Sequence, residues 1–102
     1  MYSSVATTMR FVWDEEKSRR NLAKHKVSFE TAKLVFDDPH AVSRLDRVED
    51  GEERWQTLGL AAGIVVLLVV HTYREDGGEE VIRIISARKA TANERTVYDQ
   101  GN

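Results

Sequence analysis

The chain has 102 residues, a length that supports one domain with a single core of two packed layers. Its residues are 41% hydrophobic and 31% charged, and no apolar run reaches the ~18 residues of a transmembrane helix, so no membrane association is expected. The lack of cysteine excludes disulfides and thiolate metal sites and suits the cytoplasm, and the net charge of -2 argues against a dedicated duplex-binding protein.

The first residues carry no recognisable pattern. Residues 1–9 show no periodicity, and we expect them to form a flexible extension. Organised sequence begins with Arg10 to Trp13, a short run of strand-forming residues that suits an edge strand. We therefore expect a single domain over residues 10–102.

Two helices should follow this strand. Asp14 is placed to cap the first, which should run to about His25 and pack through a narrow stripe around Leu22, its only large aliphatic residue. Ser28 is placed to cap the second, which Pro39 must stop. The residues expected on the core face of the second helix are Phe29, Ala32, Val35 and Phe36.

The second half of the chain reads as four strands and a helix. The strands are separated by short loops, which favours an antiparallel meander. Thr91 and Glu94 match the spacing of a capping box, which predicts a short final helix. The fold expected is α+β, an N-terminal strand and two helices packed on a four-strand antiparallel meander with a short C-terminal helix. The helices are expected against one face of the sheet. The predicted strands cover residues 40–46, 54–60, 64–71 and 81–90.

The last predicted strand holds cations where apolar residues dominate. A buried arginine needs a partner, a cleft or solvent, so Arg83 is a candidate for binding anions. His71 ends the neighbouring apolar run and would share a site with the arginines if the strand register allows it. Strand alternation puts Arg83 and Arg88 on opposite faces unless a bulge intervenes.

Several short motifs occur in a specific order and together resemble a known family. They are Phe11-Val12-Trp13-Asp14, Asn21 with Lys24-His25, Val27-Ser28-Phe29-Glu30, Val35-Phe36-Asp37-Asp38-Pro39, Gly51-Glu52-Glu53-Arg54, Val70-His71-Thr72, Ile82 to Ala90, and Glu94-Arg95 with Tyr98. From Arg10 to Tyr98 the chain is similar to the BrnT family of bacterial toxins. One departure is Lys26, where the family pattern usually has glycine, so a differently shaped turn is expected there.

The resemblance implies a ribonuclease toxin of a type II toxin-antitoxin pair, similar in fold to the RelE group, which halts growth by cutting RNA. It also implies a partner, a BrnA-like antitoxin with a ribbon-helix-helix domain, which neutralises the toxin and represses the shared operon as a complex. Operator DNA would then be contacted only through the antitoxin complex.

RNA cleavage without a metal needs a base for the 2'-hydroxyl, an acid for the leaving oxygen and cations that stabilise charge on phosphorus. The sequence offers such groups and no obvious metal cluster, so we expect no cofactor. The candidate catalytic residues are His71, Arg83, Arg88, Lys24 and Arg54, and the candidate RNA-binding residues are His25, Lys89 and Trp55.

Each candidate also has a structural explanation. His71 could be a strand-end histidine bonded to the backbone, and Arg83 could pair with the acidic turn near Glu52. Lys24 and His25 could serve only the dipole of their helix, and Trp55 could be core. Two functions therefore remain open: a ribonuclease toxin, or an interaction module that keeps the antitoxin-binding surface and cuts nothing.

Overall fold

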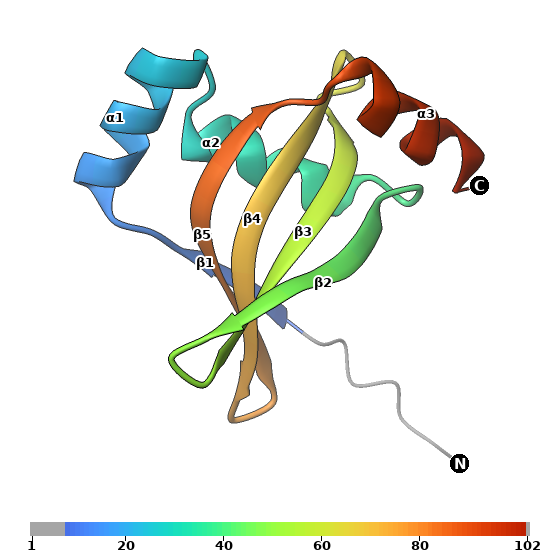
Figure 1. The fold of residues 1–102 in the computed structure, drawn as a ribbon. Helices are drawn as coiled ribbons and strands as arrows, with labels where there is room; N and C mark the ends of the chain where they lie inside the picture. The colour runs from blue at the N-terminus through green and yellow to red at the C-terminus, as the bar shows by residue number, and fades with distance from the viewer. Residues whose placement is uncertain (1–7, 102) are drawn as a thin grey trace.

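The computed structural model describes residues 8–101 and shows a five-stranded sheet with helices on both sides (Figure 1). The sheet order is β1-β5-β4-β3-β2, and none of the helices in this part of the chain is long and apolar enough to cross a membrane. The elements are β1 (Thr8–Val12), α1 (Glu15–His25), α2 (Phe29–Ala32), the 3-10 helix η1 (Lys33–Asp37), β2 (Val42–Glu49), β3 (Glu52–Ala61), β4 (Val65–Asp76), β5 (Glu79–Lys89) and α3 (Ala92–Gln100).

The predicted meander is confirmed, because β2 to β5 pair in chain order and antiparallel. Strand β1 is an edge strand as expected, and it pairs with β5 in parallel, with Thr8 beside Glu79 and Val12 beside Arg83. It begins two residues before the expected start at Arg10, and the rest of the expected extension, residues 1–7, lies outside the described residues.

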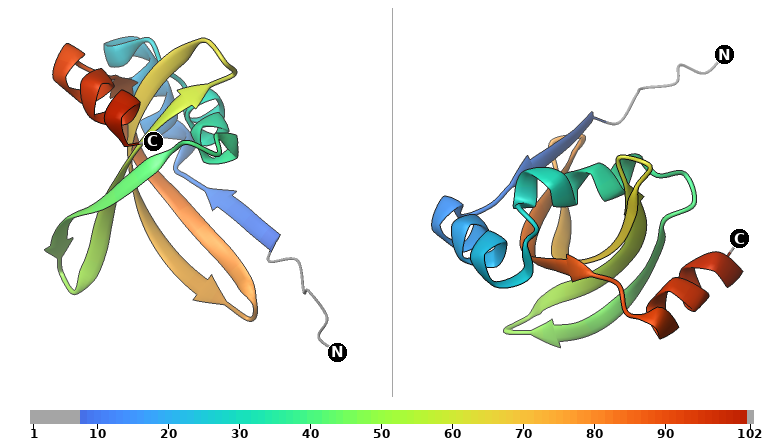
Figure 2. Two further views of the ribbon diagram at one scale, coloured as in Figure 1. Left: turned by 90° about the vertical axis from the view of Figure 1, so that its right-hand side faces the viewer. Right: turned by 90° about the horizontal axis from the view of Figure 1, so that it is seen from above.

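The two faces of the sheet are covered differently, as the views of Figure 2 show. Helix α2 and η1 pack on the face that we call the core face, where Phe29, Val35 and Val69 are fully buried. Helix α3 packs on the other face, the open face, against Leu58 and Leu68. The expectation that all helices lie on one face is therefore wrong for α3.

Helix α1 packs through polar residues rather than through the expected aliphatic stripe. Leu22 is 47% exposed, whereas Ser18 and Asn21 are buried. The Asn21 side chain donates to the carbonyl oxygens of Val27 and Ala87, both at 2.8 Å, and accepts from the Ala87 N–H at 3.2 Å. Asn21 thus takes the place of a neighbouring strand along β5, beyond the point where β1 ends.

The helix ends follow the predicted local signals. Asp14, Ser28 and Thr91 each accept backbone hydrogen bonds at a helix start, and Thr91 forms the full capping box with Glu94. Lys26 ends α1 in the left-handed conformation, with φ of 64°, which glycine adopts without strain.

A bulge in β5 decides which side chains share a face. Val70 pairs with Ser86, but the next residue, His71, pairs with Ile84, so Ile85 is an extra residue in β5. The bulge shifts the alternation by one position, and Arg83 and Arg88 consequently point to the same face of the sheet.

Candidate functional site: the arginine face

Arginines from four strands gather on the open face. Trp55 pairs with His71 on the core face, so its neighbours Arg54 and Gln56 point to the open face. Thr72 pairs with Arg83, and both line a small hollow of about 40 Å³ on that face. We call this set the arginine face, and its members are Arg44, Arg54, Arg74, Arg83 and Arg88.

Arg83 lies on the β5 side of this surface and pairs with one carboxylate. Its Nη2 donates to Oε1 of Glu52 at 2.6 Å, and the two side chains are 40% and 47% exposed. Because both groups reach solvent, their attraction is screened and their contact can be exchanged for a ligand at little cost. The pair places the carboxylate of Glu52 beside the guanidinium of Arg83. Thr72 lines the same hollow as these two residues.

Arg54 lies beside this pair and is less completely bonded. Its Nη1 is 3.4 Å from Oε1 of Glu49, and its side chain is only 24% exposed. Its Nε is buried and has no hydrogen-bond partner among residues 8–101. A guanidinium with a spare donor can donate to a phosphate oxygen more readily than one that is fully paired.

Arg88 is committed to a structural contact. It donates from Nη1 and Nη2 to the two carboxylate oxygens of Glu94, at 2.8 and 2.9 Å. This contact and the cap at Thr91 hold the pKa of Glu94 at about 2, so the carboxylate stays ionised. Arg88 therefore ties the start of α3 to β5, and its catalytic role stays a prediction.

Lys24 and His25 lie near the arginine face but outside it. They line an open hollow of about 230 Å³ between α1 and β5. Ile85 and Ser86 of the bulge form the strand side of this hollow, and Lys17 and Arg20 add two further cations. This surface of α1 lies along the edge of β5, and the roles predicted for Lys24 and His25 stay predictions.

His71 lies on the opposite face from the arginines, so the predicted shared site is wrong. Strand β4 continues to Asp76, which leaves His71 inside the strand and only 3% exposed. Its Nδ1 donates to the Thr72 carbonyl at 3.2 Å, and its Nε2 is 2.7 Å from Oγ1 of Thr57. The Thr57 hydroxyl is in turn 2.7 Å from that of Ser43, and burial lowers the pKa of His71.

This environment predicts a pH dependence of stability. The unfolded chain binds a proton at His71 near pH 6.5, whereas the folded chain takes it up only at lower pH. The free energy of unfolding should therefore decrease as pH falls below about 6.5. Urea unfolding at pH 7.5 and 5.5, for the wild type and His71→Gln, measures this, and the wild type should lose more stability than the variant. Equal losses would contradict the burial of a neutral imidazole.

The two remaining candidates are also away from the arginines. Trp55 lies on the core face, where it lines a hollow of about 330 Å³ with Phe36, His71 and Tyr73. Lys89 is exposed at the end of β5 and pairs with Leu67. By register, both side chains belong to the core face, opposite the face of Arg83.

Sequence reasoning missed several residues of the arginine face. Arg44 and Arg74 were not singled out, and Glu52 was considered only as part of an acidic turn that could pair with Arg83. The alternation of β3 would have placed Gln56 beside Arg54, but the partner strands and their bulges are not visible in the sequence. Within residues 8–101 no three His, Asp or Glu side chains converge in an arrangement that could hold a metal ion.

Comparisons with known proteins agree with the fold and identify the family. Residues 13–94 match the family model described as the ribonuclease toxin BrnT of type II toxin-antitoxin systems. The crystal structure of the Brucella abortus ribonuclease toxin BrnT superposes with a TM-score of 0.57 and 24% sequence identity, covering 82% of this chain and 99% of that one. No curated protein sequence gives a significant match. The chain belongs to the BrnT family of ribonuclease toxins of type II toxin-antitoxin systems.

Proposed function

We propose that the chain cleaves RNA on the arginine face by metal-independent acid-base chemistry, with Arg83 at the reacting phosphate. The observation that supports this most directly is the exposed contact between Arg83 and Glu52, beside Thr72 and Arg54. It combines a cation for the phosphate with a carboxylate that can accept a proton, on a surface open to a polymer.

The groups divide the reaction between them. RNA displaces the Glu52 carboxylate from Arg83 and brings a phosphate against the guanidinium. Glu52 then lies close to the 2'-hydroxyl and takes its proton, while the 2'-oxygen attacks phosphorus. The 5'-oxygen leaves and takes a proton from water. Arg54 and Arg83 stabilise the charge on the phosphoryl oxygens, and Lys24 binds the strand farther along.

The partner that we propose is a BrnA-like antitoxin with a ribbon-helix-helix domain. The family implies an antitoxin, and an antitoxin that covers the arginine face would block RNA by occupying the same surface. Because the chain itself carries a net charge of -2, operator DNA is expected to be bound by the antitoxin of the complex. The cytoplasm, where translated RNA is present, is the proposed place of action.

The test is incubation of the antitoxin-free chain with naked RNA and, in parallel, with translating ribosomes, each with and without EDTA. We expect cleavage of at least one substrate, and the same rate on naked RNA with EDTA, because the arginines supply the charge stabilisation. Full loss of naked-RNA cleavage with EDTA and its return with Mg²⁺ would sink the metal-independent mechanism.

One observation supports the alternative, an interaction module. The core face carries apolar side chains beyond the edge of η1, with Met9, Leu45 and Tyr73 exposed beside Trp55. Exposed apolar clusters of this kind occur at protein interfaces. If the folded chain cleaves neither naked RNA nor RNA on ribosomes, this cluster becomes the primary functional surface.

A further inference from the structure

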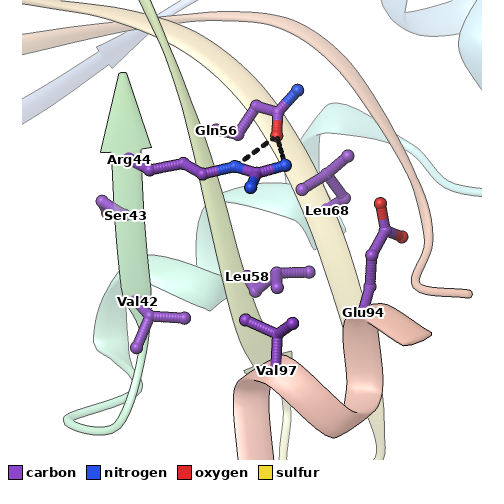
Figure 3. Close-up of a pocket in the computed structure, with 8 residues that line it drawn as sticks. All are labelled: Val42, Ser43, Arg44, Gln56, Leu58, Leu68, Glu94 and Val97. Atoms are coloured by element: carbon purple, nitrogen blue, oxygen red, sulfur yellow. Dashed lines mark hydrogen bonds between the residues drawn. The ribbon is translucent and has the colours of Figure 1, made fainter. Parts of the chain in front are cut away.

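A second pocket opens on the same face, where α3 crosses the sheet (Figure 3). Its volume is about 250 Å³, the lining is mostly apolar, and it is the space between the helix and three strands. Its lining residues are Val42, Ser43, Arg44, Gln56, Leu58, Leu68, Glu94 and Val97.

The pocket has an apolar floor suited to a flat ring. Leu58 and Leu68 rise from β3 and β4, and Val97 faces them from α3 (Figure 3). Ligand sites of this type combine an apolar lining with a few polar groups that fix orientation. The polar groups here come from two sides, Arg44 and Gln56 from the strands and Glu94 from the helix.

Arg44 is held in a fixed plane. Its Nε and Nη2 both donate to Oε1 of Gln56, each at 3.2 Å. Within the described residues, Nη1 of Arg44 and the amide nitrogen of Gln56 make no further hydrogen bond. The strand side of the pocket therefore presents hydrogen-bond donors.

Glu94 presents the opposite chemistry. Its Oε2 accepts one hydrogen bond, from Arg88, and a carboxylate oxygen can accept two. The bonds from Arg88 and the Thr91 cap fix the orientation of this carboxylate. A ligand in the pocket thus meets donors on one side and an ionised acceptor on the other.

We propose that this pocket is a nucleobase subsite for the RNA substrate and that it prefers guanine. Guanine carries an acceptor, O6, next to two donors, N1–H and N2–H₂, which matches donors from Arg44 and Gln56 and the acceptor of Glu94. Adenine has a donor where guanine has O6. The proposal rests on the proposed function and adds the base that the site selects.

The position fits a nucleotide near the cleaved one. Leu68 in the pocket and Thr72 beside Arg83 are four residues apart on β4, which is about 13 Å at ~3.3 Å per residue. Arg88 pairs with Leu68, so it lies level with the pocket on the neighbouring strand and on the same face as Arg83. The base in the pocket therefore belongs to a nucleotide flanking the one whose phosphate meets Arg83.

Binding is tested without cleavage, by NMR titration of the full chain with GMP, AMP, CMP and UMP. GMP should shift the methyl signals of Leu58, Leu68 and Val97 and bind about tenfold more tightly than AMP. Val97→Trp fills the pocket from an exposed position and should abolish these shifts. Val48→Trp, the same change at an exposed valine far along β2, should leave them unchanged.

Gln56→Leu is the second variant and should weaken GMP binding about tenfold. If Val97→Trp does not fold, the result for Gln56→Leu tests the pocket on its own. Equal binding of all four nucleotides, or GMP binding that survives both pocket variants, would overturn the proposal. So would a Val97→Trp chain that binds GMP normally but no longer binds its antitoxin, because the pocket would then be a protein contact.

Sequencing of the cleaved ends separates an RNA subsite from a site for free nucleotide. The wild type should show guanine at one fixed distance from the cut, and Val97→Trp should lose that preference. If GMP binds but the cut sites show no guanine preference, the RNA subsite is refuted. If GMP binds as predicted and no RNA is cut under any condition, the proposed ribonuclease mechanism fails while the guanine site stands.

Discussion

Replacing Arg83 with alanine is expected to lower RNA cleavage at least ~100-fold, the typical cost of removing one preorganised group that stabilises charge in the transition state. The fold should survive, because the pair with Glu52 is exposed and pairs of this kind contribute only about 0–1 kcal/mol. Cleavage is measured on the substrate that the wild type cuts, with circular dichroism as the check on folding. Antitoxin binding should remain detectable, because the change removes a single exposed side chain from the surface proposed for the antitoxin.

Lys33→Ala is the matched control for this variant. Lys33 is 39% exposed and also pairs with a single glutamate, Glu30, but it belongs to η1 on the core face. Its removal changes net charge by the same amount and should leave cleavage within about twofold. Equal losses in the two variants would show that overall charge, and not the position of Arg83, governs activity.

Replacing Asn21 with alanine is expected to lower the free energy of unfolding by about 3 kcal/mol. The change leaves the carbonyls of Val27 and Ala87 and the N–H of Ala87 without their partner, and each unsatisfied buried group costs ~1–3 kcal/mol, which water partly relieves. Urea unfolding at neutral pH measures the loss.

Asn93→Ala provides the comparison, because Asn93 is exposed on α3 and its truncation should cost less than ~0.5 kcal/mol. A loss below 1 kcal/mol for Asn21→Ala would mean that water replaces the side chain along β5. The bridge between α1 and the sheet would then contribute little to stability.

The parts of the fold that could be predicted are those encoded locally. Caps at Asp14, Ser28 and Thr91 depend on a side chain and the next few residues, so the sequence shows them directly. The short loops likewise determine an antiparallel meander. The core face of the second helix was predicted from its spacing, and Phe29, Ala32 and Val35 are fully buried.

The site could be predicted only in part, because its assembly depends on contacts between strands. His71 and Arg83 lie on neighbouring strands, but one residue of register decides whether they share a face, and here they do not. The predicted competing explanations, backbone bonding for His71 and pairing with Glu52 for Arg83, are both seen. The packing of helix α1 was predicted incorrectly for a related reason. Asn21 packs against the sheet through hydrogen bonds to backbone groups far away in the sequence, and an apolar pattern cannot reveal such bonds.

The extra residue in β5 has a consequence for mutagenesis. Substituting Ile85 keeps the residue count, so Arg83 and Arg88 stay on one face whatever side chain stands there. Deleting Ile85 restores strict alternation along β5. One of the two arginines, together with the rest of the strand on its side of the deletion, then points to the opposite face of the sheet. Scans by substitution alone will therefore score this position as unimportant, and a deletion scan will score it among the most sensitive in the chain. Alignments of distant relatives face the same difficulty, since a one-residue gap near this position exchanges inward and outward residues.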